Sequence, residues 1–156
     1  MNFHLEERAP GWAQQAPIQI RHQLQLPATP ERVFAVLADS PGWTTWFKGM
    51  RRVRIDRLGT GVGTLRTVWI GATRVQEHFI VWEPDRQITF HIVDNNIPGL
   101  RVMVEDYQIS PATDGSTLAI TVGIEAKGPL RLVPGLVRAI VGRVSGGVLG
   151  ITSLFS

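Results

Sequence analysis

The stretch that decides the fold is residues 18–53, IQIRHQLQLPATPERVFAVLADSPGWTTWFKGMRRV. Apolar and polar side chains alternate from Ile18 to Leu26, which predicts a strand with one buried face. Pro27 ends this strand. Thr29-Pro30 then predicts a helix start, because the threonine hydroxyl can accept a backbone N–H and proline is tolerated in the first turn. Ser40-Pro41 starts a second short helical turn, so a strand is followed by two small helices.

The rest of the chain is dominated by strands. Turns rich in glycine, proline, aspartate and asparagine separate six further predicted strands, at residues 53–56, 64–70, 75–82, 88–92, 101–109 and 118–124. The tail from Leu130 to Phe155 has helical spacing, weakened by one proline and five glycines. This order predicts an α+β fold, in which a curved seven-stranded antiparallel sheet is covered by the C-terminal helix. A cavity between the sheet and that helix is expected, because their surfaces differ in curvature.

Length and composition are those of one domain. The 156 residues are 44% hydrophobic and 19% charged, which excludes disordered and fibrous classes. We expect a flexible N-terminal arm at residues 1–15 and one domain at residues 16–156. The arm lacks the apolar run of a signal peptide, and the most apolar segment, Val144 to Phe155, is shorter than a membrane span. A cytoplasmic protein without stable membrane insertion is therefore expected, as a monomer or homodimer.

Charge gives little support to nucleic-acid binding. Sixteen basic and thirteen acidic residues leave a net charge of +3. The only basic cluster is Arg51, Arg52, Arg54 and Arg57, where alternation with Val53 and Ile55 predicts a solvated strand face. We expect no nucleic-acid partner.

Familiar cofactor and metal motifs are missing. There is no cysteine, which excludes disulfides and thiolate metal sites. Gly59, Gly61 and Gly63 link two predicted strands, whereas phosphate-binding glycine loops precede a helix. His78 and His91 lie on strands expected to be neighbours, but the alternation of the second strand turns His91 outward. We therefore predict no metal and no cofactor, and find no catalytic nucleophile motif.

The informative residues are polar groups on faces expected to be buried. His22 lies among the aliphatic residues of the first strand, where a satisfied core histidine is the alternative to a ligand contact. Glu77 alternates with Val75, Phe79 and Val81, and Glu105 with Met103, Tyr107 and Ile109. Burying a carboxyl group costs free energy unless it has a hydrogen-bond or ion-pair partner or contacts water. Burial also raises its pKa, which can suit the group to acid–base chemistry. The opposite faces stay open as alternatives, namely Gln76, His78, Ile80 and Trp82 on the first strand and Val102, Val104 and Asp106 on the second.

The opening stretch resembles the start of the helix-grip superfamily called SRPBCC. Further matching motifs are Gly61-Val-Gly-Thr64, VWEPDRQITFHI at residues 81–92 and SPATDGSTLAITV at residues 110–122. The superfamily includes birch-pollen-allergen proteins, START-like lipid-transfer domains and polyketide cyclases/dehydratases. The resemblance covers about residues 18 to 127 and is weakest at the glycine-rich C-terminal helix. It implies a cavity for an apolar or amphipathic small molecule, in proteins that are either carriers or enzymes.

We expect this protein to bind a hydrophobic small molecule, such as a lipid, a polyketide or an aromatic compound. The side chains expected to contact it are His22, Thr67, Trp69, Glu77, Phe79, Phe90, Glu105 and Tyr107. The alternative is a cofactor-free polyketide cyclase/dehydratase that uses general acid–base catalysis. An interaction module that docks a partner through exposed tryptophans or arginines is a third possibility. The tail glycines either make room for ligand beneath a mobile helix or allow that helix to pack closely.

Overall fold

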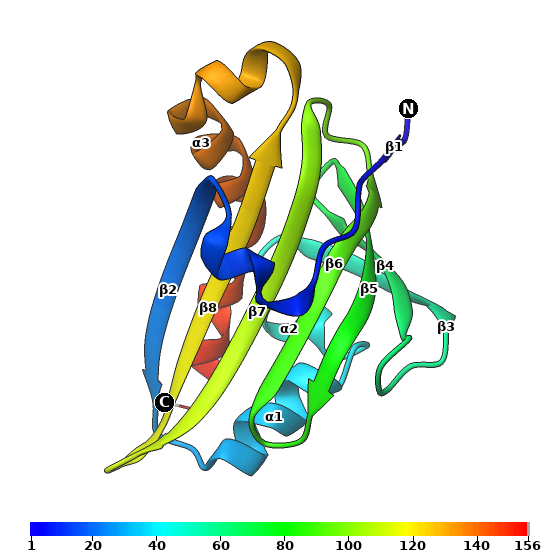
Figure 1. Ribbon diagram of the computed structural model, residues 1–156. Helices are drawn as coiled ribbons and strands as arrows, with labels where there is room; N and C mark the ends of the chain where they lie inside the picture. The colour runs from blue at the N-terminus through cyan, green and yellow to red at the C-terminus, as the bar shows by residue number, and fades with distance from the viewer. Residues whose placement is uncertain (156) are drawn as a thin grey trace.

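The computed structural model describes residues 1–155 and shows one curved antiparallel sheet with a helical layer on one face (Figure 1). The strand order is β2-β8-β7-β6-β5-β4-β3, with the short β1 added beside β6. The strands are β1 (Phe3–His4), β2 (Ile18–Leu26), β3 (Met50–Arg57), β4 (Leu65–Ile70), β5 (Thr73–Glu83), β6 (Gln87–Asn95), β7 (Leu100–Ala112) and β8 (Gly115–Ala126). The predicted helix-grip α+β fold is confirmed.

The helices gather mostly at the concave face. They are η1 (Pro10–Gln15), α1 (Pro30–Ala38), α2 (Trp43–Trp46), η2 (Gly128–Leu132), α3 (Pro134–Ser145) and η3 (Gly146–Leu154). The start of α1 is as predicted, because the Thr29 hydroxyl accepts the Arg32 backbone N–H at 3.4 Å and Pro30 occupies the first turn. Its apolar stripe, Val33, Phe34 and Leu37, is buried. In Figure 1, α3 and η3 lie behind the sheet.

The sheet separates between β6 and β7, and the N-terminal arm bridges the separation. β6 and β7 pair only between Gln87–His91 and Val104–Gln108. Beyond that point β1 pairs with the end of β6, the Leu5 backbone N–H donates to Val93 at 3.0 Å, and that of Glu6 to Arg101 at 2.8 Å. The arm crosses the front of the sheet in Figure 1. It therefore satisfies backbone groups that the separating strands leave unpaired.

This packing corrects the expectation of a flexible arm. Leu5 is only 1% exposed and belongs to the main core. In η1, Ala13 packs against Val102 and Val104 on the outer face of the sheet. The sequence of residues 1–15 has no apolar periodicity, because Leu5 and Ala13 are the only residues in this range whose side chains are fully buried. Where the domain begins stays a prediction.

The C-terminal helices are held by close backbone contacts. A Cβ atom on Gly147 would lie 2.3 Å from the Lys48 carbonyl oxygen, and one on Gly150 would lie 1.9 Å from that of Trp46. The Lys48 backbone N–H also donates to the Gly147 carbonyl at 3.1 Å. These two glycines thus let η3 pack closely onto the segment at α2, as the second of the two roles considered for the tail glycines requires. Gly146 differs, because a Cβ atom there would meet no neighbouring atom within 4 Å.

The helical segment is longer than the apolar stretch considered from the sequence. Pro134–Leu154 spans 21 residues and is long and apolar enough to cross a membrane by length and composition. In this structure the segment packs on the sheet, with Val137, Val141, Val148 and Ile151 buried. A helix that covers a protein core needs an apolar face as well, so length and composition do not distinguish the two roles.

We predict that Gly150→Ala lowers the free energy of unfolding by about 1–3 kcal/mol, because its new methyl group collides with backbone. The matched control is Gly146→Ala, at a helical φ of −62° with open space around it. It should raise the free energy of unfolding by about 0.4–1 kcal/mol. Urea denaturation measures both changes, and equal effects of the two substitutions would contradict the packing described here.

Candidate functional site

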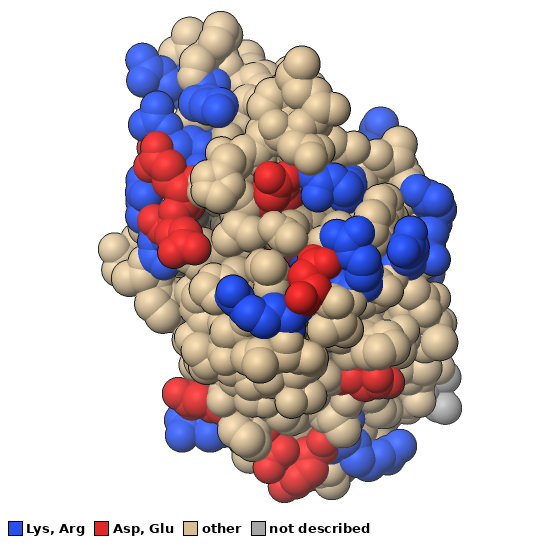
Figure 2. Space-filling view, turned by 90° about the vertical axis from the view of Figure 1, so that its right-hand side faces the viewer, with Lys and Arg blue, Asp and Glu red and all other residues tan. Residues whose placement is uncertain are grey.

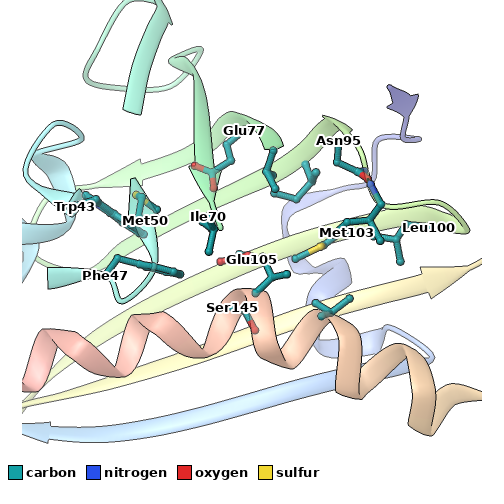
Figure 3. Close-up of a pocket in the computed structure, with 15 residues that line it drawn as sticks. Trp43, Phe47, Met50, Ile70, Glu77, Asn95, Leu100, Met103, Glu105 and Ser145 are labelled. Atoms are coloured by element: carbon teal, nitrogen blue, oxygen red, sulfur yellow. The ribbon is translucent and has the colours of Figure 1, made fainter. Parts of the chain in front are cut away.

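A small apolar cavity lies between the concave face of the sheet and α3 (Figure 3). Strands β3 to β7, α2 and α3 supply its walls. Trp43 and Phe47 lie at one end, and Asn95 and Leu100 lie at the other. The space open to the centre of a water-sized sphere is about 20 Å³. That is room for about one water molecule, so the structure is a closed form. Most of the lining is apolar, including Met50, Ile70, Val75, Ile92, Met103, Val141 and Val144.

An arginine is buried beside this cavity. Arg66 of β4 is completely inaccessible to solvent, and its Nε donates to Glu77 of β5, directly opposite in the strand register. Its Nη1 donates to the Ser40 hydroxyl at 3.1 Å, and its guanidinium lies 4.1 Å from the centre of the Trp43 ring. A charge this deeply buried is tolerated only when paired, and Glu77 supplies the pairing.

A second carboxyl, Glu105 of β7, lines the same cavity. It is 8% exposed and accepts a hydrogen bond from the Tyr107 hydroxyl at 2.9 Å. Burial and the neighbouring Glu77 carboxylate raise the pKa of Glu105 to about 8. Burial also raises the pKa of Glu77, but there the Arg66 guanidinium opposes the shift. Two carboxyls therefore lie near one cation, and a pKa of about 8 keeps Glu105 protonated at pH 7.

Aromatic rings form the floor behind the carboxyls. Phe79 and Phe90 stack with centroids 5.1 Å apart, and Phe90 stacks on Tyr107 at 5.7 Å. Burial, followed by the Glu105 carboxyl, raises the pKa of Tyr107 well above its ordinary value, so the phenol stays protonated. All three rings face inward as expected, although they lie beneath the cavity rather than along its wall.

The inward faces of β5 and β7 are the ones that place both glutamates inside. Val75, Glu77 and Phe79 are buried on β5, and Met103, Glu105 and Tyr107 on β7. A register shift between Phe79 and Val81 then turns Trp82 inward, where its ring lies 5.7 Å from that of Phe34. Both face sets considered for β5 are thus partly right, because the bulge exchanges the faces.

Thr67 and Trp69 do not lie at the cavity, which corrects the expectation. On β4 the inner face carries Arg66, Val68 and Ile70, so Thr67 and Trp69 point outward. The Thr67 hydroxyl donates to Asp56 at 2.6 Å, and the Arg52 guanidinium covers the Trp69 ring at 4.8 Å. The sequence suggested the opposite face because an arginine is rarely buried.

His22 is also outside the cavity lining, which corrects its expected place among the ligand contacts. It lies on the inner face of β2, paired with Ile120 of β8. β2 is two strands from β7, a separation of about 10 Å, so His22 does not meet Glu105. Its side chain is partly buried, and within residues 1–155 its Nε2 has no hydrogen-bond partner.

Three residues that contribute to the site were missed from the sequence: Arg66, Asn95 and Ser145. Asn95 was assigned to a loop, and Ser145 to the weakly helical tail, so no pattern singled them out. Arg66 had a usable signal, because Glu77 lies opposite it once β4 and β5 form a hairpin.

Among residues 1–155, the outer surface shows no cluster of polar groups as enclosed as the one at the cavity. His78 and His91 are directly opposite each other on the outer face, where His91 contacts the Arg8 backbone. Residues 1–155 contain no group of three potential metal-ligating side chains. Figure 2 shows basic side chains interspersed with acidic ones on the side that carries β3, and Arg54 there pairs with Asp56 at 2.6 Å. Within the same range, none of the five tryptophans is fully exposed, which disfavours docking through exposed tryptophans.

We predict that Glu105→Gln removes a pH dependence of stability. The folded protein holds the Glu105 proton up to about pH 8, whereas the unfolded chain releases it near pH 4.5. The stabilising contribution of this proton is therefore full below pH 4.5 and is lost as the pH rises towards 8, by at most about 1.4 kcal/mol per pH unit. Urea denaturation between about pH 5 and pH 9 should show wild type losing stability relative to Glu105→Gln. If the free energies of unfolding of the two proteins changed with pH in parallel, Glu105 would not hold a buried proton.

Comparison with known proteins identifies sequence relatives over most of the chain. Residues 17–151 match the family described as polyketide cyclase / dehydrase and lipid transport. An uncharacterised protein of Mycobacterium tuberculosis is 30% identical over 123 residues, which cover 78% of this chain and 74% of the relative. An uncharacterised protein of Mycobacterium bovis matches equally well.

Solved structures with the same fold are more distant in sequence. A START superfamily protein from Mycobacterium smegmatis has a TM-score of 0.68 at 12% identity, covering 88% of this chain and 99% of that one. The ZhuI aromatase/cyclase from a Streptomyces species has a TM-score of 0.69 at 16% identity, covering 86% of this chain and 88% of that one. At such identities the likeness concerns the fold. The matched family and its extent show that this chain belongs to the polyketide cyclase / dehydrase and lipid transport family.

Proposed function

We propose that the protein binds an uncharged or amphipathic hydrophobic small molecule in the cavity between the sheet and α3. The observation that carries this proposal is an apolar, enclosed space whose few polar groups are buried against it. Cavities of this kind bind ligands through apolar burial and orient them with a small number of polar contacts. Family membership supports the same class of function.

Binding requires the closed cavity to enlarge. Its volume of about 20 Å³ is far below the roughly 300 Å³ or more of ordinary ligand pockets. Burial of each ligand methylene contributes about 0.8 kcal/mol, so a chain of several carbons can offset the cost of opening.

α3 is the wall best suited to move. Of its twelve residues only Val137, Val141 and Ser145 are buried, and its first turn has no side-chain cap. η3 is anchored on α2 by Gly147 and Gly150, so Gly146, with open space around it, lies between a loosely held helix and a fixed one. We propose that α3 swings outward about this point to admit ligand.

Val144→Trp should prevent binding, because Val144 lines the cavity and an indole there occupies the space that a ligand needs when α3 moves outward. Leu136→Trp is the matched control, since Leu136 lies on the same helix and is 51% exposed. The readout is fluorescence of the uncharged probe N-phenyl-1-naphthylamine. We expect at least a tenfold loss of affinity in Val144→Trp and wild-type affinity in the control.

Hydrogen exchange supplies a second readout of the same experiment. Residues 134–146 should exchange faster without probe than with it, while residues 147–154 change little. Equal affinities of the two variants, or slow exchange of α3 in both states, would contradict a ligand beneath a movable α3. The expected cytoplasmic location and monomeric or dimeric state stay predictions.

Cyclase or dehydratase chemistry is the second candidate, and one observation favours it. Glu105 holds a proton next to the Tyr107 hydroxyl inside an apolar space, which is the environment in which a carboxyl acts as a general acid. It would donate its proton to a carbonyl oxygen of a poly-keto chain while the Glu77 carboxylate, which lines the same cavity, accepts the α-proton, so that the enol forms. A carrier returns its ligand unchanged, whereas this enzyme would consume it, so product analysis separates the two functions.

A further inference from the structure

Asn95 leaves a buried hydrogen-bond donor unused at one end of the cavity. Its side chain is completely inaccessible to solvent and lines the cavity. The Oδ1 atom accepts the Ile97 backbone N–H at 2.6 Å, which fixes the orientation of the amide because an N–H needs an oxygen acceptor. Within residues 1–155 the Nδ2 group has no acceptor. A buried amide donor without a partner is costly, so a bound acceptor is expected there.

Ser145 offers a second unused group from the opposite wall. It is the last residue of α3, is 5% exposed and lines the same cavity. In the described part of the chain its Oγ has no partner. Figure 3 shows Ser145 on the helix facing the sheet, with Glu105 across from it and Asn95 further along. The unused polar atoms therefore come from both layers that enclose the cavity.

The charges around the cavity do not suit an anion. Among the described residues, those lining it include two glutamates and no lysine or arginine. The nearby cation, Arg66, is paired with Glu77 through Nε and does not line the cavity, although within residues 1–155 its Nη2 has no partner. A carboxylate or phosphate buried here would thus meet carboxyl groups without a free cation, at a large cost. A carbonyl or hydroxyl oxygen would instead satisfy Asn95 at no such cost.

From these contacts we propose that the cavity selects an uncharged ligand with a carbonyl or hydroxyl oxygen that accepts a hydrogen bond from Asn95 Nδ2. Ser145 lies within the same space, and the apolar part of the ligand extends towards Trp43 and Phe47. Fatty-acid carboxylates and phosphate head groups are rejected. This inference rests on the proposed function and specifies its ligand class.

The test compares two competitors with eleven carbons, 2-undecanone and undecanoate, for their displacement of N-phenyl-1-naphthylamine at pH 7. Wild type should bind the ketone at least tenfold more tightly than the carboxylate. Asn95→Asp keeps the oxygen that accepts from Ile97 but replaces the donor with a carboxylate oxygen. It should weaken ketone binding about tenfold, the effect of leaving one buried polar group unpaired.

Asn96→Asp is the matched control, because it makes the same charge change at the neighbouring position. Asn96 Nδ2 donates to the Ala72 carbonyl, and the residue does not line the cavity. Its ketone affinity should equal that of wild type. Because the carboxylate added by Asn95→Asp also repels undecanoate, the decisive quantity is the loss of ketone affinity in Asn95→Asp relative to Asn96→Asp.

The outcomes separate this inference from the proposed function. If the probe itself does not bind wild type, the proposed function is wrong. If the probe binds but undecanoate competes as well as the ketone, the neutral-ligand inference alone is overturned. A ketone affinity that is the same in Asn95→Asp as in Asn96→Asp would overturn it as well, and would assign the unused donor to a bound water. Should Asn95→Asp not fold, the wild-type ratio and Ser145→Ala, expected to weaken ketone binding, decide the question.

Discussion

The site depends on one constraint, the burial of two carboxyl groups beside one cation. Arg66 and Glu77 pair across β4 and β5, and this pairing uses the guanidinium charge that lies within reach of both carboxyls. Glu105 has a tyrosine hydroxyl rather than a cation, so it keeps a proton to avoid a second buried negative charge. The interior is thereby electrically neutral, which makes it suitable for an uncharged ligand and able to donate a proton.

The fold creates the space that this neutral cluster occupies. β6 and β7 separate after five paired residues, so their far ends diverge where Asn95 and Met103 line the cavity. The N-terminal arm closes the outer side through Leu5, and α3 closes the inner side with few buried residues. One wall is therefore firmly attached through backbone hydrogen bonds, and the other, α3, is the wall that we propose to move. The glycines of η3 contribute by fixing the end of the movable helix.

Regular alternation made much of this predictable from the sequence. The strands and the α1 cap follow from period-two patterns and turn chemistry, whereas alternation alone left open which faces of β5 and β7 point inward. Thr67 and Trp69 were misplaced because residue type favoured an outward Arg66, and only the pairing with Glu77 reverses that preference. Asn95 was unpredictable, since its role depends on the separation of β6 from β7, a tertiary feature. The packing of the N-terminal arm was also unpredictable, because its contacts with β6 and β7 are tertiary and leave no periodic pattern in residues 1–15.

The most direct test of the account is a ¹³C NMR titration of the Glu105 side-chain carboxyl in wild type and in Glu77→Gln. Wild type should give a pKa of about 8 for Glu105. Removing the Glu77 charge frees Arg66 and eliminates the repulsion, so the pKa of Glu105 should fall in the variant. A wild-type pKa near the ordinary value of 4.5, or one that Glu77→Gln leaves unchanged, would contradict the shared-cation arrangement on which the proposed site rests.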